Sequence, residues 1–311
     1  MNEWASVAAV LIEPKWLAVY AWIATVLYVH FRGQVRHAFL RQVSDHSTFV
    51  APINAVIYAF SSVPRTPLLD LRHVPELKVL QDNWQVIRDE AVKLYGIGGI
   101  GKSDQLDDLG FNSFFKTGWR RFYFHWYGDF LPSAREQCPK TVELLRQCPS
   151  VHAAMFTLLA PGSRLPLHRD PFAGSLRYHL GLITPNSDQC RIFVDGQQYS
   201  WRDGQAVLFD ETYIHTAENL TDQTRIILFC DVERPLRGWL ARKFSHLIAY
   251  TLASASASRN RPDEPLGFLN RLFKYVYQIR IVGKRMKAEN QRLYYVFKYT
   301  LFAALLYWIL F

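Results

Sequence analysis

The sequence predicts an α+β fold: a double-stranded β-helix (jelly-roll, cupin-like) core with flanking helices and a transmembrane helix at each end. Short runs of β-favouring residues, separated by turn signals, fill residues 151–235. Stretches with helical periodicity lie before and after this region, and both ends of the chain are apolar. Hydrophobic residues make up 50% of the 311 residues, enough for a sizeable packed core.

Seven runs within the β-rich region are predicted to be strands. Asp195-Gly196, between apolar flanks, is a strong signal for a tight hairpin. Seven or eight short strands of this kind favour two facing sheets whose residues converge on a concave mouth. The predicted strands are residues 153–159, 176–183, 190–194, 198–201, 205–209, 214–219 and 224–232.

Helices are predicted on both sides of the strands. Apolar residues recur at helical spacing from 75 to 95, and Pro75 suits a first turn. Residues 238–252 and 266–281 are amphipathic. The glycine cluster at 96–101 lacks the spacing of a phosphate loop and follows a helix, so it is predicted to be an ordinary loop.

The two apolar ends predict membrane anchoring. Residues 16–31 contain no charged side chain, and residues 293–311 contain only Lys298. Arg32 and two further arginines follow the first stretch, and four basic residues precede the second. By the positive-inside tendency this places the middle of the chain in the cytoplasm. A buried core helix is the alternative for the first stretch. The predicted location is a bacterial inner membrane with a cytoplasmic catalytic domain.

The chain is accordingly divided into five parts, which are listed here with their predicted roles. They are 1–45, an N-terminal membrane anchor; 46–150, the mixed helical/β N-terminal part of the catalytic domain; 151–235, the jelly-roll catalytic core; 236–292, basic membrane-proximal helices; and 293–311, the C-terminal transmembrane helix.

The formal net charge of +9 is concentrated in one segment. Residues 237–298 hold 13 Lys or Arg against 3 Asp or Glu. Such a segment suits an anionic membrane surface or nucleic acid, and without a nucleic-acid-binding motif the membrane surface is favoured as partner. The four cysteines show no CxxC spacing, which indicates free thiols in a reducing compartment.

A candidate metal site comes from the spacing of three residues. His168 and Asp170 stand at i and i+2, so on extended backbone both side chains leave the same face. His215 is the third candidate ligand, in a later strand. Two histidines and a carboxylate form the facial triad of non-haem iron(II) oxygenases, although zinc accepts the same ligands and Asp170 could instead cap the turn before Pro171.

Arg225, ten residues after His215, favours iron over zinc. An arginine on a neighbouring strand can clamp the distal carboxylate of a 2-oxo acid, the co-substrate with which iron(II) and O2 hydroxylate unactivated carbon. A plain surface arginine is the alternative. The spacing therefore predicts a dioxygenase that uses Fe(2+), 2-oxoglutarate and O2.

Three segments resemble the aspartyl/asparaginyl β-hydroxylase family of iron- and 2-oxoglutarate-dependent dioxygenases: 165–182, with Leu-Arg-Tyr-His-Leu-Gly-Leu, 207–215 and 225–232. The resemblance extends over about residues 60–235. It implies that Arg177 and His179 contact 2-oxoglutarate together with Arg225, and that Thr157 touches it from a neighbouring strand.

The resemblance is strongest to the bacterial lipid A 2-hydroxylase branch, which implies hydroxylation at C2 of a secondary acyl chain of lipid A. In the animal peptide hydroxylases of the family, glycine stands where this chain has Asp170, so the carboxylate ligand is not inherited from that branch. Peptide Asp/Asn hydroxylation and hydroxylation of another lipid, such as ornithine lipid, remain alternatives. The last alternative is a binding module without catalytic activity, in which the histidines are structural.

Overall fold

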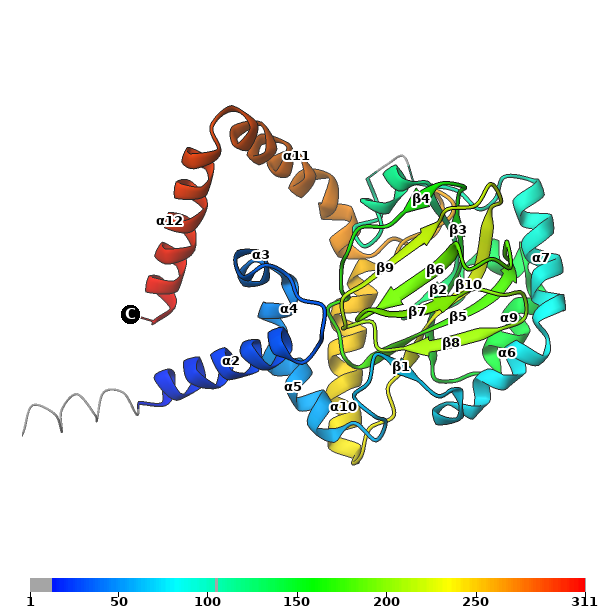
Figure 1. The fold of residues 1–311 in the computed structure, drawn as a ribbon, viewed down its shortest axis with the longest axis horizontal. Coiled ribbons are helices and arrows are strands. Elements are labelled where there is room, and N and C mark those ends of the chain that lie inside the picture. Colours follow the sequence, from blue (N-terminus) through cyan, green and yellow to red (C-terminus); the bar gives the residue numbers. More distant parts are fainter. Residues whose placement is uncertain (1–12, 104–105, 311) are drawn as a thin grey trace, which may run out of the picture.

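Two antiparallel sheets face each other in the computed structural model, which describes residues 13–103 and 106–310 (Figure 1). One sheet has six strands in the order β1 (Leu68–Leu69), β8 (Ala206–Phe209), β5 (Ser175–Ile183), β10 (Arg225–Glu233), β3 (Val151–Leu159) and β2 (Trp119–Trp126). The other has four, in the order β4 (Ser163–Arg164), β9 (His215–Asn219), β6 (Cys190–Val194) and β7 (Gln197–Ser200). This pair of sheets is the predicted jelly-roll core.

All seven predicted strands are present, but β2 was not predicted. Its eight residues are buried on nearly every position, so its aromatic side chains do not alternate with polar ones as in a half-exposed strand. The sequence there predicts buried aromatic residues but gives no period. β1 and β4 are two residues long and leave no pattern to recognise.

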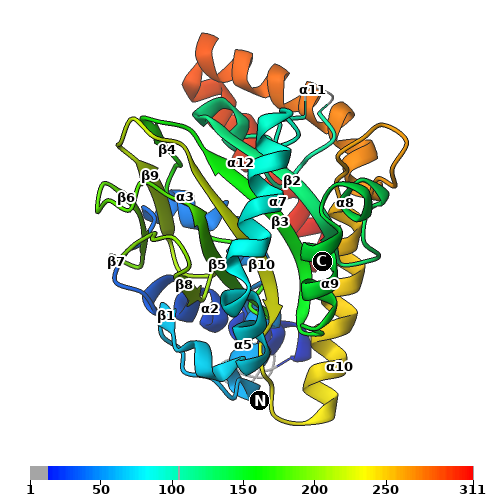
Figure 2. The same cartoon turned by 90° about the vertical axis from the view of Figure 1, so that its right-hand side faces the viewer.

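The core has two layers. Between the sheets lies a cluster that includes Ile192, Val194, Phe209 and Ile227. On the outer face of the six-stranded sheet, α7 (Trp84–Gly96) contributes to a larger cluster with β5, β10 and β3, and Figure 2 shows this helix crossing those strands. The narrow space between the sheets is where the candidate site lies.

The helix predicted at 75–95 is broken into three. The structure has η2 (Pro75–Leu77), α6 (Lys78–Asp82) and α7, with Asn83 between the last two. The Asn83 side chain donates to the carbonyl of Val79 at 2.8 Å, a local bond that competes with helix continuation. The predicted loop at 96–101 begins where α7 ends.

The remaining helices stand before and after the sheets. They are α2 (Pro14–Phe31), α3 (Phe39–Val43), α4 (His46–Phe49), α5 (Ala51–Phe60), η1 (Leu71–His73), η3 (Phe114–Thr117), α8 (Pro132–Gln137), α9 (Pro139–Arg146), α10 (Trp239–Ile248), η4 (Ala249–Ala253), η5 (Ser254–Ser256), α11 (Phe268–Glu289) and α12 (Gln291–Leu310). In Figure 1, α11 and α12 extend away from the sheets.

The prediction of a transmembrane helix at each end is wrong. Across residues 13–103 and 106–310, no helix combines the length and the apolarity needed to cross a bilayer. The 18 residues of α2 include Pro14, Lys15 and His30, and the 20 residues of α12 include Arg292 and Lys298, whereas a span needs about 20 predominantly apolar residues. The predicted inner-membrane location with a cytoplasmic catalytic domain rested on these helices and is wrong with them. Residues 1–12 and Phe311, parts of the two predicted anchors, lie outside the described residues.

Arg32, which served as a membrane-flanking charge in that prediction, is a buried side chain. Its guanidinium pairs with Asp210 at 2.9 Å and donates to Thr212 at 2.9 Å. Arg234 pairs with the same Asp210 carboxylate at 2.9 Å. The N-terminal helices are therefore part of the folded unit that carries β9.

The four cysteines are buried free thiols, in agreement with the sequence. The basic residues of α11 are exposed on the helix surface. Pairing of this segment with an anionic membrane surface, rather than with nucleic acid, stays a prediction.

Candidate active site

His168 and His215 lie opposite each other across an isolated antiparallel bridge. The His168 amide donates to the His215 carbonyl at 3.0 Å, and the His215 amide donates back at 2.7 Å. The Nδ1 atom of His168 lies 2.7 Å from the carbonyl of Pro166, and that of His215 lies 2.9 Å from the carbonyl of Tyr213. Because a carbonyl only accepts, each Nδ1 carries the proton, and each Nε2 is left with a lone pair for a metal ion.

Asp170 completes the triad. One ligand atom from each of His168, Asp170 and His215 lies within 4.8 Å of the other two, so one ion can reach all three. The amide of Asp170 donates to the carbonyl of Glu211 at 2.9 Å, which holds the aspartate beside the bridge. The structure thus brings together the three metal ligands predicted from sequence.

The protonation states suit a divalent cation. Burial, reinforced by the neighbouring His168 ring, lowers the pKa of His215 to about 3, and burial also lowers the pKa of His168. Burial opposes ionisation of Asp170, but Arg177 and the two imidazoles hold its pKa at about 2. Two neutral imidazoles and one carboxylate are the forms that bind metal ions.

Arg177 is surrounded by carboxylates. Its guanidinium pairs with Asp170 at 2.8 Å, with Asp231 at 3.0 Å and with Glu211, and it stacks over the Phe229 ring at 3.8 Å. Arg177 and Asp231 are cross-strand partners on β5 and β10, so the sheet register sets their contact. Burial raises the pKa of Glu211, which favours a protonated carboxyl there. Arg177 therefore positions the carboxylate of Asp170, the candidate metal ligand.

Arg225 has no such partner. It is buried at the start of β10, its guanidinium lies over the Trp201 ring at 4.4 Å, and Nη2 donates weakly to the Thr157 hydroxyl at 3.4 Å. Among the described residues no carboxylate pairs with it, and burial lowers its pKa to about 10. An unpaired buried guanidinium is costly, so this position suits an incoming carboxylate.

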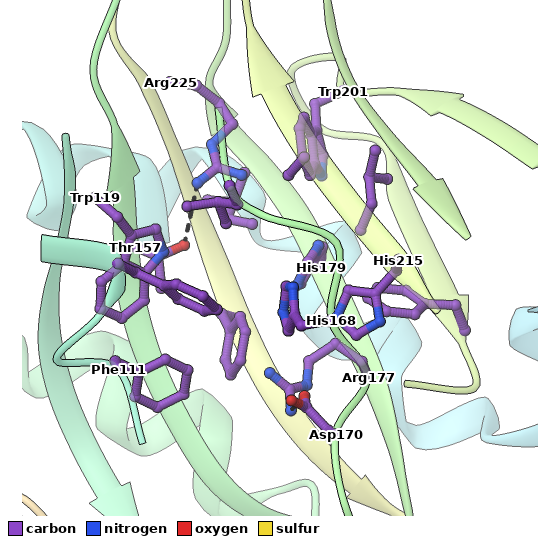
Figure 3. A pocket seen from close by; sticks show the side chains of 17 residues that line it. Phe111, Trp119, Thr157, His168, Asp170, Arg177, His179, Trp201, His215 and Arg225 are labelled. Atoms are coloured by element: carbon purple, nitrogen blue, oxygen red, sulfur yellow. Dashed lines mark hydrogen bonds and ion pairs between the residues drawn. The ribbon is translucent and has the colours of Figure 1, made fainter. Parts of the chain in front are cut away.

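The pocket between Arg225 and the triad is lined by further polar atoms without partners. Both ring nitrogens of His179 and the indole Nε1 of Trp201 are buried and make no hydrogen bond within the described structure. Figure 3 shows Arg225 and Thr157 on one side of this pocket, Asp170 on the opposite side, and the imidazoles between. The pocket therefore has hydrogen-bond donors beside Arg225 and the candidate metal ligands on its opposite side. A dicarboxylate such as 2-oxoglutarate could bind the donors with one carboxylate and a metal ion with the other.

A second, larger cavity of about 660 Å³ is lined in part by His168 and Asp170. Its walls are mostly apolar, with Ile53, Phe114, Ile248 and Leu252 among them, and its polar end holds Glu211, Asp231 and Arg177. His168 and Asp170 line both cavities. These two candidate metal ligands therefore lie at the boundary between the small pocket and the large cavity.

The segment that carries His168 and Asp170 is held by the N-terminal helices. Arg41 donates to the carbonyl of Leu167 at 2.8 Å, and His46 Nε2 donates to the carbonyl of Arg169 at 2.9 Å. The Asn54 amide donates to the carbonyl of Pro171 at 2.8 Å and accepts from the amide of Ala173 at 2.9 Å. These contacts fix an irregular stretch that has few backbone partners of its own.

All seven residues predicted from sequence line one site, but Glu211, Asp231 and Trp201 were missed. Glu211 stands four residues before His215, and Asp231 lies at an alternating position of β10 six residues after Arg225. A buried acid in an apolar strand is the signal that could have identified Asp231, because unpaired charges are rarely placed there. Trp201 carries no such signal.

A model of the aspartyl/asparaginyl beta-hydroxylase family matches residues 81–235, the stretch that contains the triad and Arg225. These residues belong to the aspartyl/asparaginyl β-hydroxylase family. The chain is 41% identical over 122 residues to an ornithine lipid ester-linked acyl 2-hydroxylase of Rhizobium tropici, a match that covers 39% of this chain and 43% of that protein.

The human aspartyl/asparaginyl beta-hydroxylase is also similar to this chain, at 28% identity over 167 residues, with 51% of this chain and 21% of that protein covered. The chain thus spans less than half the length of either relative. A crystal structure of a Pseudomonas putida prolyl-4-hydroxylase matches with 15% identity and a TM-score of 0.36, covering 59% of this chain and 99% of the other, which is too loose to carry an argument.

Proposed function

We propose that this protein is an Fe(II)- and 2-oxoglutarate-dependent dioxygenase that hydroxylates C2 of an ester-linked acyl chain on a polar lipid. One observation carries the proposal: His168 and Asp170 line both a small pocket that contains His215 and the unpaired Arg225 and an apolar cavity of about 660 Å³. Family membership supports hydroxylation as the reaction.

His168, Asp170 and His215 would hold the iron, and Arg225 would pair with the distal carboxylate of 2-oxoglutarate. Iron(II) with this co-substrate supplies the oxidation of an unactivated C–H bond by dioxygen. The protein's own contribution is placement. Thr157 and Trp201 flank the Arg225 guanidinium, and the unpartnered His179 nitrogens lie between it and the metal ligands. Direct contact of Arg177 with 2-oxoglutarate stays a prediction, beside the hold that this residue has on Asp170.

The large cavity supports an acyl substrate. Its apolar walls offer burial to methylene groups, each of which contributes about 0.8 kcal/mol on leaving water. Ester-linked acyl 2-hydroxylation is also what the Rhizobium tropici relative is named for. That relative favours an ornithine-type lipid, whereas the sequence motifs favour lipid A, and both offer an ester-linked acyl chain to the same cavity.

The test is an assay of the purified full chain with iron(II), 2-oxoglutarate and three candidate substrates: ornithine lipid, lipid A and an Asp/Asn-containing peptide. We expect succinate release coupled to one of the lipids, with mass spectrometry placing one added oxygen atom at C2 of an acyl chain. If succinate release were coupled only to hydroxylation of the peptide, the protein would be a peptide β-hydroxylase and the lipid proposal would be wrong. Lack of succinate release with iron and co-substrate present would remove the dioxygenase reaction itself.

A further inference from the structure

A second group of metal-binding side chains lies outside the active site. It consists of His152 on β3, Glu233 at the end of β10 and His246 on α10, whose ligand atoms lie within 4.8 Å of one another. His152 Nε2 lies 3.2 Å from one Glu233 carboxylate oxygen, and His246 Nε2 lies 2.8 Å from the other. Both imidazoles therefore present the same nitrogen to one carboxylate.

We propose that His152, Glu233 and His246 form a second metal site that takes a zinc ion. Zinc is bound in proteins by imidazole nitrogens and carboxylate oxygens, with a tetrahedral arrangement that water can complete. Zinc binding displaces the protons that the two Nε2 atoms direct at the carboxylate. Each proton moves to the Nδ1 atom of its own ring or to solvent, and the Nε2 lone pair binds the ion. Two neutral histidines and one glutamate leave a net charge of +1 on the zinc site, which water or an anion can balance.

The surroundings suit an ion that enters from solvent. The side chains of His152, Glu233 and His246 are 13%, 22% and 47% exposed, so the cluster is open on the His246 side. The hydroxyl of Tyr250 lies 3.5 Å from His152 Nδ1, where it orients the ring from its other nitrogen, as the outer partners of metal-bound histidines do. Glu233 is held in place by its amide, which donates to the carbonyl of Ser150 at 2.7 Å.

The site ties α10 to the sheet. β3 and β10 are neighbouring strands, whereas His246 belongs to the helix whose continuation supplies Ile248, Ala249 and Leu252 to the wall of the large cavity. A bound ion would thus replace the two hydrogen bonds to Glu233 with metal–ligand bonds. These bonds would hold α10, and with it the wall of the large cavity, against the sheet. This inference concerns the chain's metal content and stability, and it does not depend on the proposed reaction.

The experiment is zinc titration of the full-length apoprotein, with bound metal counted by elemental analysis after dialysis. We expect two equivalents in the wild type, one at the iron triad and one at the second site. His246→Ala and His215→Ala should each bind one, and the double variant should bind none at micromolar zinc. His73→Ala, a histidine of η1 outside both clusters, should bind two.

A second measurement separates metal loss from misfolding. In the His215→Ala background zinc should raise the melting temperature, and adding His246→Ala should abolish that shift while the far-ultraviolet circular dichroism stays unchanged. Glu233→Gln keeps a hydrogen-bond acceptor but loses the charge, and should weaken zinc binding by at least about 10-fold. Equal zinc content and affinity in the wild type and His246→Ala, or equal content and affinity in His215→Ala and the double variant, would overturn the proposal. A wild type that binds one equivalent, lost in His246→Ala and kept in His215→Ala, would still support the second site and would count only against zinc at the triad.

Discussion

His168 and His215 exchange two backbone hydrogen bonds across an isolated bridge, at 3.0 and 2.7 Å. The separation of the two imidazole rings, whose centroids are 4.2 Å apart, is therefore set by main-chain atoms rather than by side-chain packing. A triad built in this way keeps its geometry when one ring is removed, which makes its members good targets for substitution.

His215→Ala should lose iron without losing the fold. The ring makes one hydrogen bond, to the nearby carbonyl of Tyr213, so its removal leaves the bridge intact. We expect ferrous-ion affinity to fall by more than about 100-fold, since even outer partners of metal ligands contribute 10- to 100-fold. Calorimetric titration with iron(II) under anaerobic conditions checks this, with circular dichroism as control. Wild-type affinity would exclude His215 as a ligand.

Asp170→Gly tests whether the carboxylate is a true ligand. The substitution reproduces the glycine of the animal peptide hydroxylases, and it leaves Arg177 paired with Asp231 and Glu211. We expect weaker iron binding and slower succinate release. Unchanged values for both quantities would show that two histidines suffice in this chain.

Arg225→Ala should weaken 2-oxoglutarate binding and leave iron binding unchanged. A charge-assisted hydrogen bond contributes about 1.5–3 kcal/mol, so the dissociation constant for 2-oxoglutarate should rise about 10- to 100-fold. The matched control is Arg191→Ala, an arginine on β6 that pairs with Glu218 away from the pocket. Equal loss of iron and co-substrate would contradict the clamp.

The free energy of unfolding should decrease at low pH because the Asp210 carboxylate becomes protonated. Burial opposes its ionisation, but Arg234 and Arg32 hold its pKa well below its usual range. A carboxyl with a depressed folded-state pKa stabilises the protein above its unfolded pKa of about 3.9, and this contribution is lost as the pH falls through the folded value. The free energy of unfolding should therefore drop between about pH 5 and the acid limit of folding.

Arg32→Met should reduce both the stability near neutral pH and its acid dependence. Removing one partner of a buried pair costs about 3–5 kcal/mol, and Arg234 keeps the loss near the lower end. Urea denaturation at several pH values measures both effects. Arg72→Met, which removes an exposed partner of Asp70, should change little. An Arg32→Met variant as stable as the wild type at neutral pH would refute the role of this pair.

Ala253→Trp should shorten the acyl chains that are accepted. Ala253 lines the large cavity at the end of η4, and an indole there occupies room that the terminal carbons of a long chain would use. We expect the preferred product to shift to shorter acyl chains while 2-oxoglutarate binding is unaffected. Mass spectrometry of the hydroxylated lipids measures the shift, and unchanged chain-length preference would place the tail elsewhere.

Local patterns in the sequence predicted the strands and the main site because both depend on short-range order. Alternation and turn signals place β5 to β10, and the i, i+2 spacing of His168 and Asp170 needs only extended backbone. What sequence could not show are contacts between distant segments. From the sequence, Arg32 looked like a charge at the end of a membrane helix. In the fold it contacts Asp210, which lies 178 positions further along the chain.

The contact between Arg32 and Asp210 also determines how far the chain can be truncated. The family match begins at residue 81, but Arg32, Arg41, His46 and Asn54 all hold segments that carry the triad. A fragment trimmed to the recognised boundaries would bury Asp210 with one counter-charge fewer and leave the 167–173 loop without its anchors. Shortened versions made for crystallisation should therefore keep the residues from α2 onward, even though the family match begins only at residue 81.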